Sequence, residues 1–227
     1  MTPSRPPILA DDPEGRSAAV EVLRAGGIVA LPTDTVYGIA CDLAAPGGIE
    51  RLFSAKGRPS DRAIMLLLAE PAQASEIGLV GSAARLLGEA FWPGGLTLVL
   101  PARPDVRLPA ALTAGRPTIG LRVPDRACPR ALAAALGPMP ATSANLSGQP
   151  DAADAQAVVD QLGDSVDLVL NGGPASGGPA STVVDCTTDR PGLLRAGAID
   201  PARLAAVLDA AGLPHDLPRS GSADVGR

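Results

Sequence analysis

Short apolar segments recur along this chain, and each is bounded by Gly, Pro or small polar residues. That pattern is typical of buried strands separated by loops. The predicted strands are 28–32, 38–43, 63–69, 96–102, 118–123, 139–142, 167–170 and 181–186.

Between some of these strands the apolar residues recur at helical spacing instead. The predicted helices are 14–25, 49–55, 82–91, 128–136, 153–162 and 201–211. The first should end at Gly26-Gly27, and the last should begin with Asp200 as N-cap and Pro201 in the first turn. Because helices and strands follow one another irregularly, the sequence predicts an α/β domain with a mixed sheet.

The core of this domain must be aliphatic, because 46% of the 227 residues are hydrophobic but only 2% are aromatic. The length fits one medium domain. We assign it to residues 14–212. Residues 1–13, rich in turn formers, are predicted to be an N-terminal arm, and 213–227 a disordered tail.

The charge balance limits the classes of partner. A net charge of -5 argues against a surface that coats nucleic acid or an anionic membrane, although a small cationic pocket remains compatible with it. No apolar run is long enough to span a membrane, and the N-terminus lacks the pattern of an export signal. We therefore expect a cytoplasmic protein.

The cysteine and histidine content predicts neither a disulfide framework nor a metal site. Cys41, Cys128 and Cys186 are widely spaced, and His215 is the one histidine.

Lysine usage is the sharpest compositional feature. Of the 19 basic residues, Lys56 is the single lysine and the others are arginines. A GC-biased genome would explain the arginines. Under such a bias, a remaining lysine indicates a position where a compact ammonium cannot be replaced by a planar guanidinium.

Further cations lie beside buried strands. Lys56 and Arg58 flank Gly57, so both can turn toward one anion while the glycine permits close backbone approach. Arg122 lies within an apolar strand, where a charge must be paired or must face a cleft, and Arg195 follows an apolar pair. Neither GxxxxGK[ST] nor GxGxxG occurs in the chain.

Small polar side chains accompany these cations at strand ends. Each could simply satisfy backbone groups in its own turn. Together with the cations they describe a pocket for an anionic ligand, with a phosphorylated one as the expectation. These residues are Thr33, Thr35, Thr142, Ser143, Asn145 and Ser181.

Seven ordered segments resemble the Sua5/YciO/YrdC family over about residues 15–200. They read GGIVALPTDTVYGIACD, LFSAKGRP, FWPGGLTLVL, TIGLRVPD, ATSANLSGQP, GGPASTVVD and LLRAGAI. The resemblance implies a twisted, open mixed sheet with helices packed around it and a large concave cationic cavity. It also implies the short, single-domain form of the family.

The resemblance further implies an L-threonylcarbamoyladenylate synthase activity. L-threonine, bicarbonate and ATP, with Mg²⁺ carried by the ATP, would give threonylcarbamoyl-AMP and pyrophosphate. Downstream tRNA-modifying proteins would use the adenylate to make N6-threonylcarbamoyladenosine at tRNA position 37. Neither a membrane partner nor stable nucleic-acid binding is implied.

The same resemblance assigns roles to individual residues. Lys56 and Arg58 would be catalytic and would bind ATP together with Ser143 and Asn145, while Thr118 and Arg195 would lie near the ATP end. The L-threonine side would comprise Thr33, Thr35, Arg62, Arg122, Thr142 and Ser181.

One departure leaves alternatives open. After KGRP the family usually has His, Asn or Lys followed by Pro-Leu, whereas this chain has Asp61-Arg62-Ala63. A YciO-type paralogue with weak or different nucleotide-dependent activity, and an RNA-binding module of the same fold, are the competing interpretations.

Overall fold

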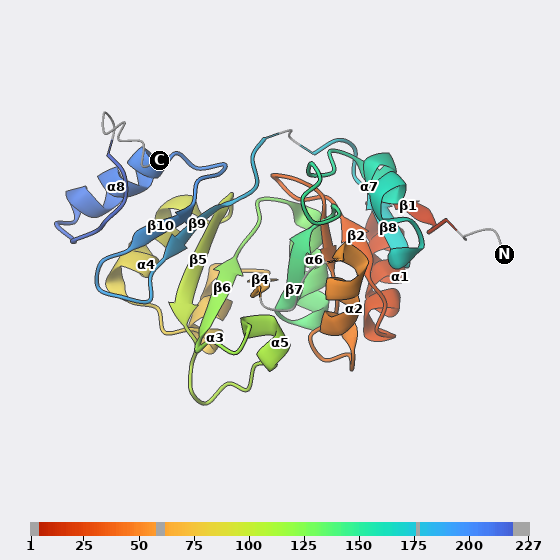
Figure 1. Ribbon diagram of the computed structural model, residues 1–227, viewed down its shortest axis with the longest axis horizontal. Helices are drawn as coiled ribbons and strands as arrows, with labels where there is room; N and C mark the ends of the chain where they lie inside the picture. The colour runs from red at the N-terminus through yellow and green to blue at the C-terminus, as the bar shows by residue number, and fades with distance from the viewer. Residues whose placement is uncertain (1–4, 58–61, 176–177, 220–227) are drawn as a thin grey trace.

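The computed structural model describes residues 5–57, 62–175 and 178–219 (Figure 1). The strands are β1 (Ile8–Ala10), β2 (Val29–Leu31), β3 (Gly38–Ala40), β4 (Met65–Leu67), β5 (Leu96–Pro101), β6 (Thr118–Arg122), β7 (Met139–Ser143), β8 (Leu168–Asn171), β9 (Thr182–Asp185) and β10 (Gly192–Arg195).

Helices connect or follow most of these strands. The α-helices are α1 (Pro13–Arg24), α2 (Gly48–Lys56), α3 (Ala74–Ile77), α4 (Ser82–Phe91), α5 (Ala110–Thr113), α6 (Ala127–Leu136), α7 (Ala155–Leu162) and α8 (Pro201–Ala210), with 3-10 turns η1 (Pro71–Gln73) and η2 (Gly163–Ser165).

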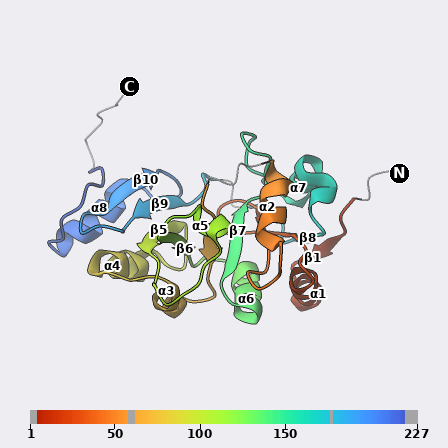
Figure 2. The same ribbon diagram turned by 60° about the horizontal axis from the view of Figure 1, so that its bottom comes forward.

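The strands form one ten-stranded mixed sheet in the order β1-β8-β2-β3-β7-β4-β6-β5-β9-β10. The pairs β1–β8, β2–β8, β4–β6 and β5–β9 are parallel, and the remaining neighbours are antiparallel. This confirms the predicted mixed α/β architecture. The sheet twists along its length, with α8 and β10 at one end and α1 and β1 at the other (Figures 1 and 2).

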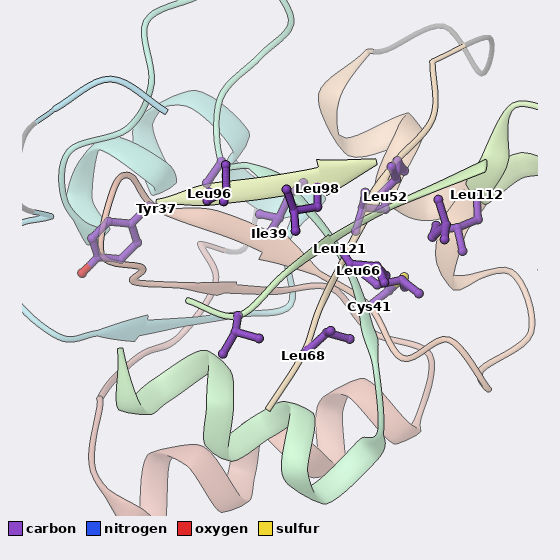
Figure 3. Close-up of a cluster of buried hydrophobic side chains, with 14 of the residues drawn as sticks. Tyr37, Ile39, Cys41, Leu52, Leu66, Leu68, Leu96, Leu98, Leu112 and Leu121 are labelled. Carbon is purple, nitrogen blue, oxygen red and sulfur yellow. The ribbon is translucent and has the colours of Figure 1, made fainter. Parts of the chain in front are cut away.

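Period-two alternation gives the sheet two different faces. On the first face, alternate strand residues such as Ile39, Leu98 and Leu121 are fully buried in a large aliphatic core, shown in part in Figure 3. Helices α2, α4, α7 and α8 contribute residues to this core.

The second face is only partly covered. Helices α1 and α6, which lie against each other, cover β2, β3, β7 and β8 through a smaller core that includes Leu23, Leu132 and Leu170 (Figure 2). Beyond these helices, the residues of β5, β6 and β9 that lie on the second face line a cavity instead. Thr97, Gly120 and Val183 are among them. The cavity is therefore the uncovered continuation of the second face.

Aspartates fix the starts of three helices. The Asp12, Asp154 and Asp200 carboxylates accept hydrogen bonds from Gly15 N, Ala157 N and Ala202 N, at 2.8, 2.8 and 2.9 Å respectively. Such caps satisfy backbone donors that have no partner within the helix. The predicted start at Asp200-Pro201 is confirmed.

The chain ends contain structure that the sequence patterns did not reveal. Residues 8–10, within the predicted arm, form β1 and pair with β8, although three residues are too few for an alternation signal. Residues 213–219, within the predicted disordered tail, pack against the fold. His215 and Leu217 are buried there, and Asp216 N donates to Pro191 O at 2.8 Å. The prediction of disorder is wrong for this segment.

Three further short elements were also missed. Strand β10 and helices α3 and α5 have four residues each, which is too short for a periodic pattern to identify them. In the part of the chain that the structure describes, no helix combines the length and apolar character needed to cross a membrane.

Candidate active site

The cavity on the second face has a volume of about 1020 Å³. Five cationic side chains line it, and no Asp or Glu is among the described lining residues. The cations are Lys56, Arg62, Arg116, Arg122 and Arg195. A site with this lining favours anions, because the described lining contributes more positive charge than negative charge; Arg122 is paired with Asp34, which is not itself a lining residue.

The structure brings the predicted site residues together at this cavity. Arg58 lies outside the described residues. Every other residue named from the sequence is in the lining: Thr33, Thr35, Lys56, Arg62, Thr118, Arg122, Thr142, Ser143, Asn145, Ser181 and Arg195.

Lys56 is the last residue of α2, where a positive charge interacts favourably with the helix dipole. Gly57 follows in the left-handed region with φ 55°, which ends the helix. The Lys56 ammonium is 4% exposed and donates to Ser143 O at 2.5 Å, Ser143 Oγ at 3.2 Å and Asn145 Oδ1 at 2.9 Å. Three converging acceptors hold it against the loop that follows β7.

The Asn145 side chain links this ammonium to the loop. Its Oδ1 also accepts from Ser143 Oγ at 2.5 Å, while its Nδ2 donates to Gln149 O at 2.6 Å and Leu146 O at 3.2 Å. Both ends of the amide are therefore engaged, and the oxygen is directed toward Lys56.

Arg122, on β6, is 3% exposed and neutralised by an acidic neighbour. Its guanidinium donates to Asp34 Oδ1 at 2.7 Å, Thr35 Oγ1 at 3.1 Å and Gly94 O at 3.0 Å. Burial lowers the pKa of Arg122, and the Asp34 carboxylate opposes that shift. The guanidinium thus fixes the 33–35 turn relative to β6.

The two threonines of that turn point toward each other. Thr33 Oγ1 lies 3.1 Å from Thr35 Oγ1 and donates to Val36 O at 2.6 Å. These bonds satisfy local backbone groups, as a plain turn would require. Both threonines also line the cavity, so the turn has a structural role and a place in the site.

Ser181 forms the opposite wall, at the start of β9. Its hydroxyl lies 2.8 Å from Thr97 Oγ1, and Arg195 donates to Ser181 O at 2.8 and 3.1 Å and to Ser181 Oγ at 3.1 Å. These bonds hold Arg195, the last residue of β10, next to Ser181 in the cavity wall.

Gly197 must be glycine for this wall to pack. A Cβ at Gly197 would lie 2.6 Å from Ser181 O and closer still to Ala180 O, which are rigid backbone atoms. We expect Gly197→Ala to lower the free energy of unfolding by about 1–3 kcal/mol through overpacking, as measured by urea denaturation. Gly192→Ala, at the start of β10, is the control because its Cβ would meet nothing within 4 Å. Equal stability of the two variants would contradict the prediction.

Among the described lining residues with polar side chains, sequence reasoning missed three: Thr97, Arg116 and Ser147. Thr97 could have been found, because it lies between the buried Leu96 and Leu98 and so must face the other side of the sheet. Arg116 and Ser147 lie in loops, where no periodicity reports the direction of a side chain.

The described residues offer neither a metal cluster nor an activated thiol. No group of three or more His, Cys, Asp or Glu side chains among them could hold a metal ion. Burial raises the pKa of Cys41 and Cys186 to about 12 and raises that of Cys128 as well, so these thiols stay protonated. The cations and hydroxyls of the described lining are suited to binding and orienting anions.

Comparisons with known proteins point in one direction. Residues 21–197 match the model of the Sua5/YciO/YrdC family, described as "Telomere recombination". The chain is 38% identical over 200 residues to a Bacillus subtilis protein named Threonylcarbamoyl-AMP synthase, covering 87% of this chain and 57% of that one. It is 40% identical over 211 residues to a Mycobacterium tuberculosis protein named Putative threonylcarbamoyl-AMP synthase, covering 89% and 95%.

Solved structures extend the similarity. Sua5 of P. abyssi complexed with L-threonine has a TM-score of 0.83 at 30% identity, covering 93% of this chain and 62% of that one. YciO of E. coli has a TM-score of 0.76 at 32% identity, covering 87% and 97%. The chain therefore spans somewhat more than half the length of the B. subtilis and P. abyssi proteins and nearly the full length of the other two.

Proposed function

The chain belongs to the Sua5/YciO/YrdC family, and we propose that it is an L-threonylcarbamoyladenylate synthase. The observation that carries the proposal is the cavity lining, whose described residues comprise five cations and a ring of hydroxyls and include no carboxylate. This composition fits a triphosphate beside an amino-acid carboxylate.

The nucleotide would occupy the part of the cavity around Lys56. In this assignment Lys56, Ser143 and Asn145 bind the phosphates, together with Arg58. Thr118 and Arg195 contribute from β6 and β10. Lys56 and Arg58 are the proposed catalytic pair, because a compact ammonium and a guanidinium at one anion can offset charge that develops during phosphoryl transfer.

L-threonine would occupy the part around the 33–35 turn. Thr33, Thr35, Arg122, Thr142 and Ser181 are the proposed contacts, and the P. abyssi structure with L-threonine supports an amino-acid site in this fold. Arg62 extends the same group and replaces the usual His, Asn or Lys. Its exposed guanidinium at the cavity can bind a carboxylate.

Mg²⁺ would enter with ATP, bound by the phosphate oxygens. The residues described here fit that arrangement, because they offer no acidic cluster that would hold the ion independently. The metal would supply charge neutralisation on the triphosphate.

The reaction then depends on positioning and charge. Bicarbonate loses hydroxide to give carbon dioxide, and the threonine amine adds to its carbon. The amine proton leaves with that hydroxide as water, and a carbamate remains. A carbamate oxygen attacks the α-phosphorus, its new P–O bond replaces the bond to the β-phosphate, and pyrophosphate leaves. The cations stabilise the departing negative charge, so no protein nucleophile is needed.

This role implies particular surroundings. Downstream tRNA-modifying proteins would consume the labile adenylate, so the enzyme would work beside them in the cytoplasm. Residues 14–212 would form the catalytic domain, with 8–10 completing its sheet.

A YciO-type paralogue is the second candidate. It is favoured by the similarity to E. coli YciO over nearly all of that chain and by the Asp61-Arg62-Ala63 departure from the family pattern. An RNA-binding module has less support, because a net charge of -5 and a near absence of aromatics suit neither duplex nor single-strand binding.

Mass spectrometry of rapidly quenched reactions tests the proposal. With ATP, Mg²⁺, bicarbonate and L-threonine we expect threonylcarbamoyl-AMP and pyrophosphate, and neither should form when threonine or bicarbonate is omitted. Intact ATP in the presence of a protein that binds it would overturn the synthase and favour the paralogue. Salt-sensitive retention of RNA at low micromolar protein would favour the binding module.

A further inference from the structure

Gln161 on α7 is connected to the nucleotide end of the cavity without lining it. Its Oε1 accepts from Leu146 N at 3.2 Å, and its Nε2 donates to Pro150 O at 3.0 Å. One amide therefore joins both ends of the turn 146–150.

Hydrogen bonds rather than apolar packing hold the shape of this turn. Residues 146–150 are all exposed, so apolar packing does not fix them. Within the turn, Gln149 N donates to Leu146 O at 2.9 Å, and Ser147 N donates to Lys56 O at 3.1 Å. Hydrogen bonds thus carry the geometry of the turn, and the Gln161 amide supplies two of them.

The shape of the turn decides where the Asn145 amide points. Its Nδ2 donates to two carbonyl oxygens of the turn, Leu146 O and Gln149 O, which leaves Oδ1 facing Lys56 at 2.9 Å. If the turn changes shape, those carbonyls move and the Asn145 amide loses the bonds that orient it. Lys56 would then lose the Asn145 acceptor.

We propose that Gln161 is a positioning residue for nucleotide binding, acting through the 146–150 turn and Asn145 on Lys56. The inference rests on the proposed function, in which this end of the cavity holds ATP. Nothing in the sequence pattern distinguishes Gln161 from any other polar residue on a helix surface.

Gln161→Met tests this, because methionine keeps the length of the side chain and removes both hydrogen bonds. We expect the Kd for Mg²⁺-ATP, measured by calorimetry, to rise about three- to tenfold, the range expected for one or two lost hydrogen bonds. The KM for L-threonine should stay within about twofold. Hydrogen exchange at the Leu146 amide should accelerate, because that donor loses its acceptor.

Gln156→Met is the matched control on the same helix. Gln156 is exposed and donates only to Asp160, at 2.8 Å, among the bonds recorded for it, so this variant should bind ATP like the wild type. Both variants should unfold within about 2 °C of the wild type, because Val158, Val159 and Leu162 still anchor α7 in the core.

Three outcomes would count against the idea in different ways. An unchanged Kd for ATP in Gln161→Met would overturn the positioning role. A parallel loss of ATP binding, threonine use and thermal stability would replace it with a general structural role. A wild-type protein that binds no ATP would instead remove the proposed function.

Discussion

Replacing Lys56 by alanine is expected to lower kcat for adenylate formation about a hundred- to thousandfold, the usual cost of removing one pre-organised group that stabilises developing charge. The ammonium is 4% exposed and directed at the loop that carries Ser143 and Asn145. Pyrophosphate release under saturating substrates measures the effect. Lys56→Met is a second variant that fills the volume if the alanine protein is unstable. Near-normal turnover in either folded variant would contradict the assignment.

Lys56→Arg keeps the positive charge and changes the shape of the group that carries it. The three acceptors of Lys56 converge on one nitrogen, whereas a guanidinium is a planar fork with donors directed apart. We therefore expect the arginine variant to remain strongly impaired although its charge is preserved. Full activity would contradict this expectation and show that position 56 requires a positive charge but not the geometry of an ammonium.

Replacing Arg122 by methionine is expected to lower the free energy of unfolding by about 3–5 kcal/mol, because it removes one partner of a buried ion pair. The guanidinium has three acceptors: Asp34, Thr35 and the Gly94 carbonyl. All three would lose this charged donor, and Thr35 among them is buried. Urea denaturation measures the loss, and it should be accompanied by weaker binding of L-threonine because the 33–35 turn loses its anchor.

A double-mutant cycle isolates the pair itself. Asp34→Asn alone should lower the free energy of unfolding by less than Arg122→Met does, because the Asp34 side chain is 15% exposed and water can reach it. In the protein with both changes, the decrease in the free energy of unfolding should be smaller than the sum of the decreases in the two single variants. Strict additivity would show that the 2.7 Å contact between Arg122 and Asp34 contributes nothing to stability.

Elements of the sheet show where sequence patterns succeed. The short apolar segments 96–102 and 118–123 predicted strands, and the structure places β5 and β6 there, with Leu98 and Leu121 buried on the same face. Such segments identify strands because a strand packed inside a domain is rich in apolar residues and is bounded by turn-forming residues.

Strand β1 shows where such patterns fail. It has three residues, all exposed, and exists because it pairs with β8, which is about 160 positions away along the chain (Ile8 with Val169). A contact of this kind is not encoded in any local window. The 213–219 segment is similar, because His215 and Leu217 become buried only once α8 and the β9–β10 turn are in place.

The sequence by itself determined the chemistry of this protein: an aliphatic α/β core, a single lysine among many arginines, and a set of arginines and hydroxyls suited to an anion. These are properties of residue type and local period, which need no tertiary contact. Only the tertiary structure decided that these residues meet at one cavity, that Asp34 neutralises Arg122 and that Gln161 braces the turn beside Asn145. Each of these depends on the end of one strand or helix reaching another element, and that juxtaposition is set by the packing of the whole sheet.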